Sequence, residues 1–549
     1  MKRSLILCIV IALMLSMSSC GQSGAQTPDA TDAPAPMDTT GKYVLDLERN
    51  EAILNDLNPI STVNEGNNRA FYHIFVGSFS DSDGDGTGDL RGIINRFDYL
   101  NDGDDASGLS LGVEGIWLSP IFTSPSYHKY DVTDYYEIDP KFGTMEDLKE
   151  LVELCHSRNV KIILDLVINH TARNNEWFRS FAAAHKDGNT EDPYYDFYTW
   201  TTEPQSGRTF YTIPGAQDYY EGNFSGEMPE LNFENEAVCQ AIVDVAKYYL
   251  DLGVDGFRFD AAKYIYYGEE QRNADFWIWY MNELRTIKPD IYSVAEVWDS
   301  DGITFPYFAS TNCFNFTMAQ TSGMIAQTAK DGDVNAFVNY LNNYIEQIKA
   351  QSPNATPVTF IANHDTDRAA GFLTVSSGQA KVGANLSLLL PGSTFIYYGE
   401  EIGMKGSRGS ANTDANRRLA MLWGDEDTIS DPVGADYSSE QVNGTVAEQL
   451  PNGDSLYNYY KKLIAIRKAY PEIAYGTFTP VNTQTKVAGF ISTYEDSSVV
   501  VLHNTTQEAV TMDISQIPAA EIAAFVGVND ATLDGTALTI GAQTSVILK

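Results

Sequence analysis

The chain has 549 residues, enough for two or three domains. Its formal net charge of −38 at neutral pH disfavours binding to nucleic acids and to anionic lipid headgroups. With 20% charged and 43% hydrophobic residues, the composition is that of a globular protein. Its 32 Tyr and 7 Trp suggest a polar surface on which sugars or nucleic-acid bases could stack, and the acidity disfavours bases.

The N-terminus has the features of an export signal. Lys2 and Arg3 precede a largely apolar run over residues 5–17, which is too short to count securely as a membrane-spanning helix. The run ends in Ser-Ser-Cys-Gly, which resembles a bacterial lipoprotein signal. We therefore predict a signal peptide over residues 1–19, a lipid on Cys20 as the only membrane contact, and an extracytoplasmic location. The alternative is an ordinary secretory signal with an incidental cysteine.

Residues 20–42 are rich in Pro, Ala, Thr, Asp and Gly and cannot bury apolar area, so we predict a flexible tether. Three cysteines follow it, Cys155, Cys239 and Cys313, without the spacing of a disulfide framework or a zinc site. We expect them to be small buried hydrophobic residues, and a single bridge such as 155–239 is the alternative.

From about residue 70, short β-rich runs alternate with helical stretches, the pattern of parallel β/α units. We predict eight strands, over residues 70–80, 112–122, 161–169, 254–260, 291–298, 313–318, 357–365 and 393–398. Helical patterns cover residues 145–158, 236–252, 274–287, 334–349 and 455–469. This order predicts a (β/α)8 TIM barrel in two parts, 43–169 and 233–475. A doubly wound sheet is the alternative, but no Gly-rich phosphate loop follows a strand.

Two segments fall outside the barrel pattern. Residues 170–232, after the third strand, have dense aromatics and little helical periodicity, and so long a connection inside a compact domain is normally functional. We predict a small inserted domain overhanging the barrel mouth. Residues 476–549 contain short alternating strands, at 485–494, 498–504, 509–513 and 545–548, which predict a C-terminal antiparallel β-sandwich.

Polar residues gather where the predicted barrel strands end. They are Asp165, Asn169 and His170 after the third strand, Arg258 and Asp260 on the fourth, Glu296 on the fifth, and Asn363, His364 and Asp365 on the seventh. The carboxyl ends of barrel strands build active sites. For any one of these acids alone, a satisfied ion pair would be the better interpretation. Four acids with one Arg and two His at the same end predict an active site.

Several carboxylates without a phosphate loop or a hydroxyl nucleophile motif indicate acid and base work on a glycosidic bond. Arg258 and Asp260 are two residues apart on a strand, so both side chains point to one face, where the cation holds Asp260 ionised as a nucleophile. Glu296 precedes apolar Val297 and Trp298, where desolvation raises a carboxyl pKa, which suits a general acid. Trp298 could equally belong to the core.

The segments around these residues resemble four ordered signature segments of the α-amylase family, glycoside hydrolase family 13. They are residues 165–170, 256–264, 295–298 and 360–365. Residues 112–120, 228–232 and 417–423 are similar to further motifs of the family. The resemblance covers roughly residues 66–549, and the ordered set is specific although any one segment is weak.

The resemblance implies a retaining mechanism, in which Asp260 attacks the anomeric carbon, Glu296 protonates the leaving oxygen and then activates water, and Asp365 holds sugar hydroxyls. It also implies the substrate-binding residues Tyr130 as a platform under the cleaved glucose, His170 and His364 on the sugar, Lys263 at a leaving-group subsite, and Arg258 oriented by Asp165. The family often has Gly where Lys129 stands. Arg368 would pair with a site acid or begin a surface helix.

For specificity, the resemblance favours an α-amylase that cleaves internal α-1,4 bonds of starch and maltooligosaccharides. A small residue after the nucleophile, here Ala261, tends to accompany α-1,4 cleavage in the family, and Lys263 resembles the lysine that α-amylases place at a leaving-group subsite. Residues 228–232 look intermediate between oligo-1,6-glucosidases and neopullulanases, which makes those enzymes the first alternative. A non-catalytic glucan-binding surface protein is the alternative from another class, although such relatives typically lack one of the working acids. A calcium-dependent adhesion module would leave the strand-end carboxylates unexplained.

An acidic loop follows the first strand. Asp81, Asp83, Asp85, the carbonyl of Thr87, and Asp89 present oxygens at alternate positions, and hard oxygen ligands in this number suit Ca²⁺. The loop is not an EF-hand, because Gly92 stands where the twelfth-position Glu is needed. Its resemblance to the first-strand loop of the oligo-1,6-glucosidase branch favours a calcium site over a solvated acidic turn.

Overall fold

A computed structural model describes residues 66–105, 107–410, 412–437 and 441–549. The predicted signal peptide, the tether and the lipidation site Cys20 lie outside the described residues. None of the helices in the described part of the chain is both long and apolar enough to cross a membrane.

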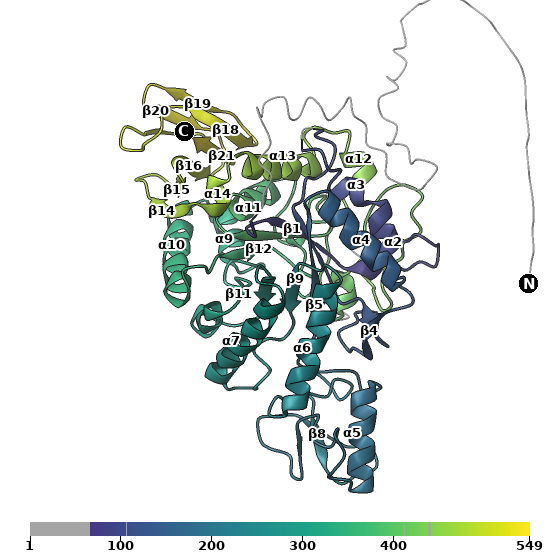
Figure 1. Cartoon of the computed structure of the whole chain (residues 1–549). Helices are drawn as coiled ribbons and strands as arrows, with labels where there is room; N and C mark the ends of the chain where they lie inside the picture. Colours follow the sequence, from purple (N-terminus) through teal and green to yellow (C-terminus); the bar gives the residue numbers. More distant parts are fainter. Residues whose placement is uncertain (1–65, 106, 411, 438–440) are drawn as a thin grey trace, which may run out of the picture. The chain divides into compact units, whose positions relative to one another are not determined.

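Eight parallel strands form the central sheet (Figure 1). They are β1 (Ala70–Ile74), β2 (Gly115–Leu118), β5 (Lys161–Leu166), β9 (Gly256–Phe259), β10 (Tyr292–Ala295), β11 (Asn312–Cys313), β12 (Val358–Phe360) and β13 (Ser393–Tyr397). Their order is β11-β10-β9-β5-β2-β1-β13-β12. A parallel bridge between Phe314 and Val358 joins the two ends of this order, so the sheet closes into a barrel. The barrel prediction is confirmed, and the doubly wound alternative is wrong.

Several of the helices that flank the strands begin with side-chain caps. Thr144 forms a capping box with Asp147 at the start of α4 (Met145–Ser157), and Asn235 caps α6 (Glu236–Asp251). The longer remaining helices are α7 (Glu270–Ile287), α9 (Met324–Asp331), α10 (Val334–Gln351), α11 (Gln379–Leu388) and α13 (Leu456–Ala469). Shorter ones are α2 (Leu90–Asn95), α3 (Phe97–Leu100), α8 (Asp301–Thr304), α12 (Val446–Gln449) and α14 (Glu472–Tyr475). All five predicted helices are present, with shifted ends.

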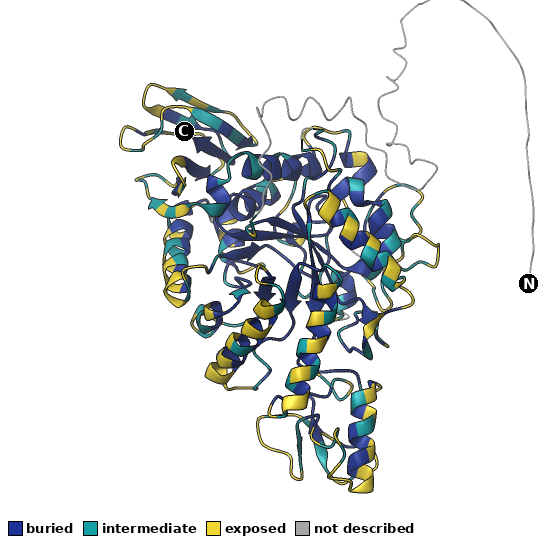
Figure 2. Cartoon of the chain, viewed as in Figure 1, coloured by how far each residue is buried: buried dark blue, intermediate teal, exposed yellow. Residues whose placement is uncertain are grey.

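The barrel interior is closely packed and not a pore. The strands are buried except at Lys161 in β5 and Asn312 in β11, which are partly exposed (Figure 2), and their apolar residues match this burial. Aromatic side chains fill the interior, and Phe71 stacks on Phe395 with ring centroids 4.8 Å apart. Above this layer lies Trp117, 5.3 Å from the guanidinium carbon of Arg258. The interior therefore supports the charged groups of the site from below.

Between β5 and β9 the chain forms α5 (Glu176–Asp187) and a three-stranded antiparallel sheet of β6 (Trp200–Thr201), β8 (Tyr219–Glu221) and β7 (Phe210–Thr212). The expectation of little helical periodicity was wrong for α5. This helix is capped by Asn175, and Gly188 ends it in the left-handed conformation. Its buried face consists of aromatic and small residues, Phe178, Phe181, Ala182 and Ala184, which gave no aliphatic stripe to detect. A further hairpin, β3 (Phe122–Thr123) with β4 (Asp134–Ile138), follows β2.

The C-terminal segment contains two antiparallel sheets, as predicted. The larger has the order β14-β15-β16-β21-β18 and the smaller β17-β20-β19. Their bounds are β14 (Thr477–Val481), β15 (Ala488–Tyr494), β16 (Ser497–Asn504), β17 (Val510–Asp513), β18 (Ile522–Gly527), β19 (Ala531–Asp534), β20 (Ala537–Ile540) and β21 (Thr544–Leu548). Buried aliphatic residues such as Leu502, Leu538 and Val546 form a common core. Cys155, Cys239 and Cys313 are free, so the disulfide alternative is wrong.

Candidate active site

A cavity of about 1140 Å³ lies where the barrel strands end. Asp260 directly follows β9 and Glu296 directly follows β10, so the parallel strands place both at the same rim. The cavity is lined by acids, bases and aromatic rings, among them Tyr127, His128, Tyr130, His170, Phe224, Asp260, Lys263, Tyr264, Glu296, Trp298, Asp365, Arg408, Asp414, Arg417 and Arg418.

Arg258 connects three of the acids. Its Nη1 lies 2.9 Å from Asp165 Oδ1 and 2.5 Å from Asp260 Oδ1, and its Nη2 lies 3.3 Å from Glu296 Oε2. The Arg258 and Asp165 side chains are fully buried, whereas Asp260 and Glu296 keep 11% and 14% of their side-chain surface exposed. The arginine thus holds two carboxyl groups at the cavity wall, and Asp165 holds the arginine.

Glu296 lies in an environment that favours its protonated form. Burial raises its pKa to about 7, against the pull of Arg258 and with support from the charges of Asp260 and Asp365. Its Oε2 accepts a hydrogen bond from the Ala261 amide at 3.0 Å. Ala261 has φ of +49°, a left-handed conformation that suits a small side chain and turns this amide toward Glu296. The raised pKa agrees with the expectation from the apolar neighbour Val297.

Asp365 is held as an anion. Burial alone would raise its pKa, but His364 and Arg418 outweigh burial and lower the pKa below its ordinary value. Arg418 Nη2 lies 2.8 Å from Asp365 Oδ1, and His364 Nε2 lies 2.9 Å from Oδ2. Arg417 donates to the Asp365 backbone carbonyl at 2.7 Å. Two arginines from the loop after β13 therefore fix this carboxylate.

Tyr130 joins the acids to the histidines. Its hydroxyl donates to Asp165 Oδ2 at 2.9 Å and lies 2.7 Å from His364 Nε2, while its ring stacks on His364. Its backbone carbonyl lies 3.2 Å from His170 Nε2. Burial lowers the pKa of both histidines, which favours their neutral forms, although the neighbouring acids Asp260 and Asp365 act in the opposite direction. The contacts of its hydroxyl, ring and carbonyl therefore fix the position of the Tyr130 side chain at the wall of the cavity.

Beyond Glu296, the cavity wall becomes aromatic. Lys263 donates to the Trp298 carbonyl at 2.8 Å and pairs with Asp299 at 3.0 Å. The Trp298 ring stacks on Phe316 with centroids 4.8 Å apart and is 39% exposed, so it belongs to the cavity wall and not to the core.

The structure brings the predicted site residues together in two layers. Asp260, Glu296, Asp365, Tyr130, His170 and Lys263 line the cavity, whereas Asp165, Arg258 and His364 lie buried beneath them. Among the described residues, Arg368 forms no ion pair with a site acid, and it directly precedes a short 3-10 helix, η3 (Ala369–Gly371). It is buried and donates to the carbonyl oxygens of Tyr398 at 2.6 Å and Arg417 at 2.9 Å.

The sequence analysis placed Arg417 and Arg418 in a motif of the family without predicting a role for either residue. It made no prediction for Tyr127. In the structure, Arg418 binds Asp365 and also donates to the Tyr127 hydroxyl at 3.1 Å. The two partners of Arg418 lie 53 and 291 residues away along the chain, so only the closure of the barrel brings them together.

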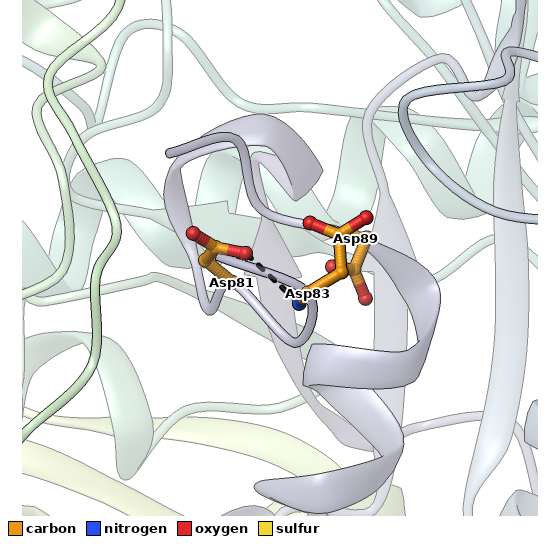
Figure 3. Close-up of side chains that lie close together, drawn as sticks. All are labelled: Asp81, Asp83 and Asp89. Atoms are coloured by element: carbon orange, nitrogen blue, oxygen red, sulfur yellow. Dashed lines mark hydrogen bonds between the residues drawn. The ribbon is translucent and has the colours of Figure 1, made fainter. Parts of the chain in front are cut away.

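The acidic loop gathers part of its predicted ligand set (Figure 3). Carboxylate oxygens of Asp81, Asp83 and Asp89 all lie within 4.8 Å of one another, and the Asp83 amide donates to Asp81 Oδ1 at 3.1 Å. Asp85 is not in this group of carboxylates. Burial raises the pKa of Asp89, which backbone hydrogen bonds partly offset. Three hard oxygen donors, one of them buried, fit a calcium ion, because a cation would relieve both the desolvation and the mutual repulsion.

Comparisons with known proteins agree with this geometry. A family model described as alpha amylase, catalytic domain, matches residues 73–476. Alpha-amylase 3 of Dictyoglomus thermophilum is 34% identical over 495 residues, covering 88% of this chain and 93% of that protein. Oligo-1,6-glucosidase of Bacillus cereus is 28% identical over 527 residues, covering 81% and 91%. The solved structure of Eubacterium rectale Amy13B has a TM-score of 0.84 at 34% identity and covers 92% of this chain and 99% of that one.

Proposed function

Because this chain belongs to the α-amylase family of glycoside hydrolases, we propose that it cleaves internal α-1,4-glucosidic bonds of starch, maltodextrins and related α-glucans with retention. One observation carries the proposal: Arg258 joins Asp260 and Glu296 at the wall of a cavity large enough for several sugar units. Two carboxyl groups in different environments are what glycoside hydrolysis requires.

The contacts support a separate role for each carboxyl group. Arg258 binds one oxygen of Asp260 and leaves the other oxygen to attack the anomeric carbon. Glu296, with its pKa raised to about 7, retains a proton for the leaving oxygen and, once ionised, takes one from water. Asp365, held by His364 and Arg418, accepts hydrogen bonds from sugar hydroxyls.

Substrate positioning is assigned to the groups around these acids. The Tyr130 ring provides a platform under the glucose that is cleaved, and His170 lines the cavity beside it. His364 is buried and acts by holding Tyr130 and Asp365 in place. Lys263 and Trp298 lie beyond Glu296 and contact the leaving-group sugar. The neopullulanase and oligo-1,6-glucosidase alternatives use the same acids, so only substrate preference separates them.

Three separate incubations of the purified enzyme, with soluble starch, pullulan and isomaltose, test the proposal. We expect short maltodextrins from starch and no products from pullulan or isomaltose. Panose from pullulan, or glucose from isomaltose, would assign the enzyme to one of the alternatives. Binding of starch without turnover of any of the three would favour the non-catalytic glucan-binding protein.

We also propose that the acidic loop holds one calcium ion. Asp81, Asp83 and Asp89 would bind it through carboxylate oxygens. Asp85 and the Thr87 carbonyl, at alternate positions of the same loop, would be further ligands. The ion would stabilise the loop that leads into α2, because the Asp89 Oδ1 that caps α2 at the Gly92 amide belongs to the same carboxyl group.

A last proposal concerns location. The motif at Cys20 supports lipidation and a bacterial cell-surface or periplasmic enzyme with no other membrane contact. Expression of the full chain in a bacterial host should place it in the detergent-soluble membrane fraction. Cys20→Ala should release it from that fraction, and an unchanged distribution would contradict the anchor.

A further inference from the structure

The turn over residues 124–131, between β3 and β4, presents three side chains to the cavity, those of Tyr127, His128 and Tyr130. Lys129 stands between them, yet it is only 6% exposed. Its ammonium group lies 2.7 Å from Asp139 Oδ2 and 3.3 Å from the Ser124 carbonyl. A lysine on a cavity-lining turn is thus engaged with the protein interior.

Asp139 has few other sources of charge compensation among the described contacts. Its Oδ1 accepts from the Lys141 amide at 3.1 Å and its Oδ2 from the Ser124 amide at 3.3 Å. Both side chains of the ion pair are 7% exposed, so neither charge is well hydrated. Lys129 therefore ties the middle of the turn to its first residue and to the chain after β4.

The backbone at Lys129 supports a role for its side chain. Lys129 has φ of +66°, in the left-handed region that glycine adopts without strain and other residues disfavour. Glycine would give the turn its shape at lower conformational cost, but it would remove the tether to Asp139. The ion pair with Asp139 compensates for the conformational cost of a left-handed backbone at Lys129.

The turn's position matters at the site because Tyr130 directly follows Lys129. The Tyr130 hydroxyl must lie within hydrogen-bonding distance of Asp165 and His364, at 2.9 and 2.7 Å, while its carbonyl meets His170 at 3.2 Å. A shift of about 1 Å in a positioning group can cost on the order of a hundredfold in rate.

We propose that Lys129 is a positioning residue, which holds the sugar platform Tyr130 in place through its buried ion pair with Asp139. The inference rests on the proposed function, since it requires a sugar to lie against Tyr130. Lys129 itself does not touch the substrate. It acts through the backbone of the turn.

Lys129→Gly is the sharpest test, because it relieves the left-handed backbone while it removes the tether. We expect a folded enzyme whose kcat/KM on maltooligosaccharides falls about tenfold or more, through a higher KM as well as a lower kcat, because Tyr130 lies at the cleaved glucose. Lys129→Arg should retain activity within about threefold, since it restores the charge. Asp139→Asn, an isosteric change, should reproduce the loss, and the double variant should lose no more than either single variant.

The matched control is Lys149→Met, which removes an exposed ion pair of similar length, 2.8 Å to Glu146, on α4. Its kcat and KM should equal those of the wild type. If Lys129→Gly lowers the melting temperature but leaves kcat and KM unchanged, the ion pair is only structural and the inference is wrong.

A binding measurement separates this inference from the proposed function. In an Asp260→Asn background, calorimetry with maltotriose should show at least fivefold weaker binding when Lys129→Gly is added. A wild-type enzyme that cleaves no α-glucan would contradict the proposed function. An active wild type whose kinetics Lys129→Gly does not alter would contradict only the role of Lys129.

Discussion

Arg258 forms ion pairs with Asp260 and Glu296, and its Nη1 donates a hydrogen bond to Asp260, so Asp260→Asn can keep an acceptor for the guanidinium. Asp260→Asn keeps the size and the acceptor oxygen of the side chain but removes the nucleophile. We expect kcat to fall by more than about 10³-fold. Release of reducing sugar from starch measures the loss, and a thermal melt establishes that the fold is intact.

The control is Asp275→Asn, on the exposed side of α7, where the carboxylate accepts a hydrogen bond from Gln271. It should leave kcat unchanged. A pure Asp260→Asn enzyme with substantial activity would remove Asp260 from the role of nucleophile.

Glu296 must carry a proton to act as the general acid. Because burial raises its pKa to about 7, kcat/KM should decline as the pH rises through about 7, well above the range in which an ordinary Glu ionises. A pH profile from 5 to 9 with a maltooligosaccharide substrate measures this limb. With α-glucosyl fluoride, whose leaving group needs no proton, Glu296→Gln should lose the alkaline limb and keep a larger share of its activity. An unchanged limb in the variant would assign it to another group.

At the scale of elements, the acidic loop and helix α2 form one unit, because Asp89 both caps the helix and faces the other carboxylates. Removal of calcium with a chelator should lower the melting temperature, and added calcium should restore it. A free concentration of a hundredfold over Kd corresponds to about 2.7 kcal/mol of stabilisation.

Asp83→Asn should abolish the response to calcium, whereas Asp513→Asn, on an exposed strand of the C-terminal segment, should not. Elemental analysis of the purified enzyme counts the ions directly. A melt that is indifferent to chelation, with no calcium bound, would reduce the loop to a solvated acidic turn.

The elements also show why some of the fold could be predicted and some could not. All eight barrel strands were predicted, because buried β-rich runs between helices are visible in the sequence, but their ends were placed too late. The predicted strand 70–80 ends at Ile74, and the residues beyond it form a 3-10 turn and the acidic loop. Hydrophobic patterning does not mark where hydrogen bonding between strands stops and a site loop begins. Strands β14, β18, β19 and β20 were not predicted.

For the site, the acids at the strand ends were predictable, since strand order fixes the rim on which they gather. The residues that pair with these acids were not predictable. Arg418 reaches Asp365 across 53 residues, and nothing in either local sequence specifies that pairing. The tether from Lys129 to Asp139 was likewise invisible, because a left-handed backbone at a lysine has no sequence signature.

At the scale of the whole molecule, the formal net charge of −38 counts every carboxyl group as ionised, whereas some buried carboxyl groups retain their protons. Burial raises the pKa of Glu230 and Glu400 to about 8, and both are almost completely buried. In the unfolded chain each ionises near its ordinary value of 4.5. The folded state therefore binds more protons than the unfolded state between these values, and its free energy of unfolding falls as the pH rises from about 4.5 to 8.

Glu400 gives the clearest test of this slope. Its Oε1 accepts from the Tyr460 hydroxyl at 3.0 Å, an interaction that Gln also makes, while neighbouring Glu401 adds repulsion once Glu400 ionises. The melting temperature of the wild type should fall between pH 5 and pH 8, and Glu400 accounts for on the order of 4 kcal/mol of the change. Glu400→Gln cannot ionise, so its melting temperature should fall less over the same range, and exposed Glu153→Gln should follow the wild type. Parallel curves for Glu400→Gln and the wild type would mean that Glu400 is already ionised in the folded enzyme at pH 5, with its charge stabilised by Arg368 and the Ala362 amide against burial.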